Sequence, residues 1–133
     1  MKTAKPFYHP GDQVTGNIYI RLMVPMNAST LEIKVKGKEK AKFIRYYSNG
    51  QSTWSECIRY EHKHIEFKGV CFTFNGPLNP GDYTIPFEFD LPNDIPGSIC
   101  FRDDTRMEKP KAEIKYTVKA VLNTVDNRVL KYK

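Results

Sequence analysis

The sequence predicts an all-β fold, namely an immunoglobulin-like antiparallel β-sandwich. Apolar and polar residues alternate with a period of two in five stretches, and no stretch shows a convincing helical period. Turn signals rich in glycine and proline separate these stretches. Short strands at near-regular spacing without helices favour a sandwich over a parallel α/β fold. With 133 residues, the chain is long enough for one ordinary domain and too short for two.

The first two expected strands cover residues 14–22 and 31–43. Even positions of the first are mostly apolar. In the second, the apolar residues occupy odd positions, namely Leu31, Ile33, Val35, Ala41 and Phe43. The opposite face of the second strand carries five lysines: Lys34, Lys36, Lys38, Lys40 and Lys42. Only a strand places alternate residues on one side, so we expect this face to be exposed to water.

Three more strands are expected at residues 65–74, 83–91 and 114–122. The apolar positions of the first change from odd to even at Gly69, which predicts a β-bulge there. Pro86 lies inside the second and has no N–H to donate. Either this strand is at a sheet edge, or residue 86 points the position of its missing N–H outward. The third alternates cleanly from Ile114 to Leu122.

A polar stretch from Tyr46 to Lys63 is expected to be a long connection between strands. Connections of this length in compact domains are more often functional than idle. Three of its aromatic residues form a candidate partner-binding loop: Tyr46, Tyr47 and Trp54. Trp54 either packs over the end of the sandwich or stands exposed as an interface anchor, a common role of tryptophan.

The charge is concentrated near the start of the chain. Residues 1–45 hold nine lysines and arginines against three acidic residues, and this excess equals the whole net charge of +6. Nucleic acid, anionic lipid and phosphorylated partners all deserve consideration for such a segment. No apolar run reaches the ~20 residues of a membrane span, and no signal peptide is evident. Three cysteines without paired spacing indicate free thiols in a reducing compartment.

Cys57, His62, His64 and Cys71 could in principle bind zinc, because thiolate and imidazole suit that ion. Their spacing matches no common zinc pattern, so we expect no metal site. A cysteine–histidine nucleophile also lacks a third orienting group. We therefore expect no enzymatic activity, no catalytic residues and no cofactor.

Two segments resemble the arrestin-like family. Residues 6–16 (PFYHPGDQVTG) resemble the family opening Y-x-P-G-[DE]-x-V-x-G, and residues 80–92 (PGDYTIPFEFDLP) resemble its signature G-x-y-x-x-P-F-x-F-x-L-P. Residues 94–98 and 114–120 continue the match in the family's order, and residues 69–74 match more weakly. The residues that carry the resemblance are Pro10, Gly11, Gly16, Gly81, Pro86, Phe87, Phe89, Pro92, Pro96 and Tyr116.

The resemblance implies that residues 1–133 form one arrestin-like N-terminal sandwich of seven or eight strands, either truncated before a second sandwich or an unusual single-domain member. It implies a non-enzymatic adaptor in endocytosis, protein trafficking or signalling. The expected partners are membrane receptor or transporter tails, phosphorylated ones included, together with trafficking or ubiquitin machinery. The expected location is cytoplasmic, with recruitment to the plasma membrane or endosomes.

The five lysines are a candidate site for phosphate groups or anionic lipid. The alternative is a solvated face that discourages edge-to-edge pairing, since lysine is a usual guard against it. Alternatives for the whole domain are a retromer-like sorting subunit and a secreted ligand-binding sandwich, which a disulfide or a glycan on Asn27 would favour. A nucleic-acid binder is not expected, because the usual motifs are absent.

Overall fold

The computed structural model describes residues 1–126 and 129–132. It consists of eight strands: β1 (Lys2–Thr3), β2 (Gln13–Leu22), β3 (Ala28–Ser48), β4 (Thr53–Thr73), β5 (Gly81–Asp90), β6 (Ile99–Arg102), β7 (Lys111–Thr124) and β8 (Val129–Tyr132). The described residues form no helix. The expectation of an all-β fold is therefore confirmed.

The strands form two antiparallel sheets. The first has the order β1-β2-β5, and the second has the order β4-β3-β7-β6, with β8 also paired to β7. β5 closes one side of the three-stranded sheet, so the expected edge position of Pro86 is confirmed. An edge strand tolerates proline because one of its sides has no hydrogen-bonding neighbour.

The core lies between the two sheets and follows the predicted alternation. β2 and β5 bury their apolar faces against the odd-numbered face of β3 and the matching face of β7. The principal core residues are Val14, Ile18, Leu31, Ile33, Val35, Ile85, Phe87, Phe89, Ala120 and Leu122. Burial of these side chains fixes the register, because a slip by one residue would move the apolar side chains of a strand from the core face to the solvent face.

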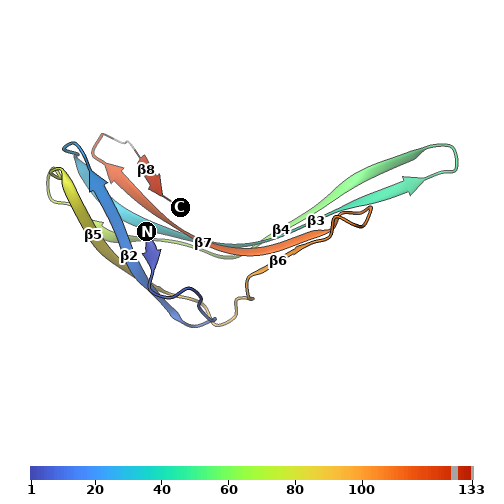
Figure 1. The fold of residues 1–133 in the computed structure, drawn as a ribbon, viewed down its shortest axis with the longest axis horizontal. Helices are drawn as coiled ribbons and strands as arrows, with labels where there is room; N and C mark the ends of the chain where they lie inside the picture. Colours follow the sequence, from blue (N-terminus) through green and yellow to red (C-terminus); the bar gives the residue numbers. More distant parts are fainter. Residues whose placement is uncertain (127–128, 133) are drawn as a thin grey trace.

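The expected connection from Tyr46 to Lys63 is wrong, because most of it belongs to β4. β3 and β4 pair from Thr30 with Thr73 to Ser48 with Thr53, so they form one long hairpin. Its turn is short, with Gly50 at φ 85° and the backbone N–H of Ser52 donating to Oδ1 of Asn49 at 2.8 Å. We call residues 39–62 of this hairpin the arm. Figure 1 shows the arm projecting from the sandwich.

The predicted bulge at Gly69 is also misplaced. Gly69 pairs regularly with Ile33, and the register of β4 against β3 shifts between Leu31 and Glu32 and again between Gly37 and Lys38. The extra residues on β4 are thus Cys71 and His64. Cys71 turns toward the core, while Val70 and Phe72 are 57% and 49% exposed. β3 keeps its alternation, so its lysines stay on one face.

Candidate functional site

The five-stranded sheet is bent along its length, as Figure 1 shows. The three-stranded sheet covers one limb on the outside of the bend, and the arm forms the other limb. The lysine-bearing face of β3 is turned away from the three-stranded sheet and lies on the inside of the bend. The predicted lysine stripe therefore lines a concave surface.

Neighbouring strands extend the stripe into rows of basic side chains. Three positions of β3 have a basic residue directly opposite on both β4 and β7. We call these the basic rows: Lys34 with Lys68 and Lys119, Lys38 with Lys63 and Lys115, and Lys42 with Arg59 and Lys111. Directly opposite side chains start ~4.5–5.5 Å apart, and successive basic rows are about 13–14 Å apart along the strands.

Glutamates stand between the basic rows and neutralise part of the charge. Lys36 Nζ lies 2.6 Å from Oε1 of Glu66, which also pairs with Lys63. Hydrogen bonds from these two ammonium groups lower the pKa of Glu66 to about 2. The sequence pattern of β3 alone suggested no such compensation, because these glutamates come from a different strand.

A second glutamate of β4 acts in the same way, since Glu61 pairs with both Lys38 and Lys40. The hydrogen bond with Lys38 lowers the pKa of Glu61 and raises that of the lysine. At the buried end of the stripe, Lys68 Nζ lies 3.2 Å from Oε1 of the largely buried Glu32.

A positive excess remains after these pairs are counted. From Glu32 to Lys42 and across β4 and β7, the face carries eleven lysines and arginines against four glutamates. This surplus of seven exceeds the net charge of +6 of the whole chain. In the described part of the chain, no ion pair involves Lys34, Lys42, Lys119 or Arg59.

The face is hollowed where the sheet bends. A cavity of about 300 Å³ is lined by Lys36, Lys38, Lys40, Glu113, Lys115, Thr117 and Lys119. Glu113 is the single acidic member of this lining, and its Oε1 lies 3.9 Å from Nζ of Lys115. Such a hollow presents several ammonium groups to one ligand and suits a compact anion.

The three aromatic residues of the predicted binding loop lie on strands at the far end of the arm. Tyr47 and Trp54 stand opposite one another, with ring centroids 5.7 Å apart and planes 15° from parallel. The Tyr47 hydroxyl donates to Oε2 of Glu56 at 3.1 Å. Tyr46 points to the other face, where its hydroxyl donates to the carbonyl of Met107 at 3.2 Å. Trp54 is 50% exposed, so it does not cap the sandwich.

The arm carries an apolar surface that the sequence did not reveal. The three-stranded sheet ends before it, so the face that continues the core side of the sheet is uncovered there. The register places on this face Phe43, Ile58, Tyr60, Ile99 and Phe101, which we call the arm patch. Tyr60 and Phe101 are 53% and 54% exposed. An exposed apolar patch of this kind is typical of a protein interface.

The four residues weighed for zinc do not converge. His62 and His64 lie edge to face with centroids 4.8 Å apart, but His64 Nε2 is bonded to Oε2 of Glu39 at 2.9 Å. Cys57 is far along the arm, and Cys71 lies in the bulge. Among the described residues, no three histidine, cysteine or acidic side chains are placed to hold a metal ion.

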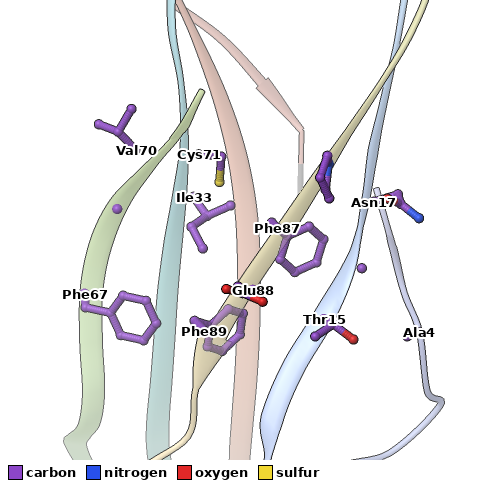
Figure 2. Close-up of a pocket in the computed structure, with 13 residues that line it drawn as sticks. Ala4, Thr15, Asn17, Ile33, Phe67, Val70, Cys71, Phe87, Glu88 and Phe89 are labelled. Carbon is purple, nitrogen blue, oxygen red and sulfur yellow. The ribbon is translucent and has the colours of Figure 1, made fainter. Parts of the chain in front are cut away.

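A cleft of about 720 Å³ opens between the edge strands β4 and β5. Figure 2 shows Phe67 of β4 facing Phe89 of β5, and their ring centroids are 5.2 Å apart. Cys71 lies at the same opening, and burial raises the pKa of its thiol. A raised pKa disfavours the thiolate, which is the opposite of what a nucleophile requires.

The family signature residues hold the sandwich together at its ends and core. The Gly11 N–H donates to the carbonyl of Pro92 at 3.1 Å and joins the two signature segments. Gly16 permits close packing, since a Cβ there would lie 2.8 Å from the Phe87 ring. Tyr116 donates from its hydroxyl to the carbonyl of Pro96 at 2.6 Å. These contacts within the sandwich are structural.

Comparisons with known proteins agree with this architecture. The sporulation control protein Spo0M from Bacillus subtilis has a similar fold, with a TM-score of 0.57 at 15% sequence identity. The alignment covers 98% of this chain and 44% of Spo0M. The arrestin domain-containing protein A of Dictyostelium discoideum is 30% identical over 132 residues, or 93% of this chain. The chain spans only 23% of the length of that relative.

The described residues form no helix long and apolar enough to span a membrane. The family profile described as arrestin (or S-antigen), N-terminal domain, matches residues 1–131. Together with the two-sheet architecture and the signature contacts, this match covers almost the whole sequence. The chain belongs to the arrestin family and corresponds to its N-terminal domain.

Proposed function

We propose that this domain is a non-enzymatic adaptor that binds the cytoplasmic tail of a membrane receptor or transporter and links it to trafficking or ubiquitin machinery. Membership of the arrestin family supports an adaptor role. The proposal places the domain in the cytoplasm, with recruitment to the plasma membrane or endosomes through its cargo.

The arm patch is the observation that carries this proposal. Half-exposed Tyr60 and Phe101 stand in one row across the sheet, with Ala41 and Ala112 between them. Small residues between two aromatic rings leave a shallow apolar floor. Aromatic anchors around such a floor are typical of protein interfaces, where they supply most of the binding energy.

The tip of the arm extends this surface. Trp54 and Tyr47 stack on the same face as Phe43 and Ile58 and stand two rows farther out. Tyr47 and Trp54 thus lie on the same face as the arm patch, and the row of Arg45 and Glu56 stands between them and Phe43. A hairpin held by two long paired strands presents these side chains in a fixed arrangement, which lowers the entropic cost of binding.

The test is binding of a panel of membrane-protein tail peptides, measured by fluorescence anisotropy with the wild-type chain and the variant Tyr60→Ser/Phe101→Ser. The matched control is Tyr19→Ser, because Tyr19 is an equally exposed tyrosine on the other sheet. We expect the double variant to lose at least tenfold in affinity, since truncated hot spots cost 2 kcal/mol or more, at about 1.4 kcal/mol per factor of ten. Equal binding by all three proteins, or no binding by any, would refute the proposal.

A further inference from the structure

The outer side of β4 in the arm is an open sheet edge. β4 is the end strand of the five-stranded sheet, so no described strand pairs with its outer side. Closer to the sandwich, bulges at His64 and Cys71 interrupt this strand, and the edge strand β5 carries Pro86. Bulges and prolines are usual devices against edge-to-edge pairing. Residues 53–63 contain neither, so this segment can accept another strand.

Three residues of this edge turn their backbone groups outward. The N–H of Ile44 donates to the carbonyl of Glu108 at 2.7 Å, on the side of β3 away from β4. The partner of Ile44 on β4 is Cys57. Because the two residues of a non-hydrogen-bonded pair both point away from each other, Cys57 directs its N–H and C=O to the open side. By alternation, Arg59 and Glu61 do the same.

We propose that two copies of the chain join through this edge, in an antiparallel pairing whose two-fold axis passes through Tyr60. In this register Arg59 of each copy lies opposite Glu61 of the other, and the two residues exchange backbone hydrogen bonds. Both side chains are exposed, and Arg59 makes no ion pair with a described residue. Tyr60, which is 53% exposed, meets its own copy on the face of the arm patch. Each copy contributes the same surface, as a two-fold interface requires.

The charges of the edge favour this register over its neighbours. An axis at Arg59 would place that residue against its own copy, and an axis at Glu61 would oppose two glutamates and bring Arg59 against Lys63. Like charges directly opposite one another are destabilising. An axis at Ile58 would leave Arg59 without an acidic partner, and an axis beyond Glu61 would run the pairing into the bulge at His64. Charge complementarity therefore favours a second copy in one register.

The paired segment is short, because it runs only from Cys57 to Lys63 in each copy. A contact of this size makes a weak dimer whose population depends on protein concentration. The pairing also joins the arm patches of the two copies on one sheet face. The inference does not rest on the proposed adaptor function, since its test contains no cargo peptide.

The test is sedimentation velocity over about a hundredfold range of concentration, with the wild type and the variants Arg59→Glu and Glu61→Arg. Each variant replaces both opposite-charge pairs with like-charge pairs, so we expect at least about tenfold weaker self-association. An equimolar mixture of the two variants regains both opposite-charge pairs and should dimerise like the wild type, which a loss of structure could not produce. The control Arg102→Glu makes the same charge change on β6, at the other edge of the sheet, and should alter the affinity by less than about threefold.

A disulfide on the two-fold axis tests the register directly. Copies of Tyr60→Cys would have Cα atoms ~4.5 Å apart, within the range that a disulfide spans. The background Cys57→Ser/Cys100→Ser removes the two exposed thiols. In the same background, copies of the control Ser55→Cys would stand ~33 Å apart. The proposal is overturned if the wild type stays monomeric at every concentration, if the mixture does not dimerise, or if Ser55→Cys cross-links as fast as Tyr60→Cys under mild oxidation.

Discussion

Gly37 lies directly beneath the ring of Tyr116, and a Cβ at position 37 would stand 2.4 Å from the Cε1 atom of that ring. It would also lie 2.5 Å from Cγ2 of Ile65. The other end of the tyrosine is held by its hydrogen bond to Pro96, so the ring cannot move away freely. This contact occurs at the bend, where the buried limb of the sheet becomes the arm.

The first prediction concerns this contact. Gly37→Ala should lower the free energy of unfolding by about 1–3 kcal/mol, because the added methyl overfills a packed site. Urea denaturation measures the change. Gly69→Ala is the matched control, since Gly69 is on the adjacent strand and a Cβ there meets nothing within 4 Å. If both variants were as stable as the wild type, the ring of Tyr116 would not lie as described.

The sandwich limb could be predicted from the sequence because burial imposes a period of two on its strands. Leu31, Ile33 and Val35 face the core, and Ile85, Phe87 and Phe89 face them from the other sheet. The arm could not be predicted in this way, since it has no covering sheet and its strands need no regular alternation. The clue was present in Asn49-Gly50, a turn signal that forms the tip of the hairpin.

The candidate site could be predicted only in part, for a similar reason. The lysines of β3 are visible in one stretch of sequence, but their neighbours across the sheet are not. Lys115 meets Lys38 because the register is set by the buried residues between the strands, far apart in sequence. The bulge at His64 further shifts which residue of β4 joins each row. Pairing of this kind follows from the fold and cannot be read from local periodicity.

The second prediction concerns the signature strand. Phe87 is only 4% exposed and stacks on Phe89, with ring centroids 6.3 Å apart. Phe87→Ala should therefore cost about 3–5 kcal/mol of stability, as a large cavity in a packed core does. Thermal melting checks this, and Phe101→Ala on the exposed arm patch serves as the comparison, with a cost below about 1 kcal/mol. A melting temperature unchanged by Phe87→Ala would show that β5 is in another register.

The third prediction concerns the thiols. All three cysteines are free, with Cys57 and Cys100 exposed and Cys71 partly buried. Burial raises the pKa of Cys71, so at neutral pH it has a smaller thiolate fraction than an exposed cysteine and should react more slowly. Titration of the native protein with a thiol reagent should show two fast groups and one slow group, and three equivalent groups after unfolding. A single reactive thiol in the unfolded, unreduced protein would reveal a disulfide and contradict the structure.

The fourth prediction concerns the outermost basic row. Arg59 lies opposite Lys42, and Lys111 lies on the other side of that lysine. Arg59→Glu replaces a like-charge pair with an opposite-charge pair, so it should raise the free energy of unfolding by about 0.2–1 kcal/mol at low salt. Arg59→Gln should give a smaller gain, and high salt should diminish both. Destabilisation by Arg59→Glu at low salt would indicate that the row is not formed.

The last prediction concerns pH. Lys36 and Lys63 hold the pKa of Glu66 at about 2, below its ordinary value of 4.5. Because the folded pKa lies below the unfolded one, this carboxylate contributes stability above about pH 4.5, and the contribution is lost as the pH falls toward about 2. Glu66→Gln lacks the titrating group, so its stability should fall less steeply over this window than that of the wild type. The group is exposed and screened by salt, so the difference should shrink at high ionic strength.

Glu88→Gln on the three-stranded sheet is the control, since Glu88 makes no ion pair with any described residue. Denaturation curves at several pH values measure the slopes, and identical slopes for the wild type and Glu66→Gln would mean that these lysines do not hold Glu66 in solution.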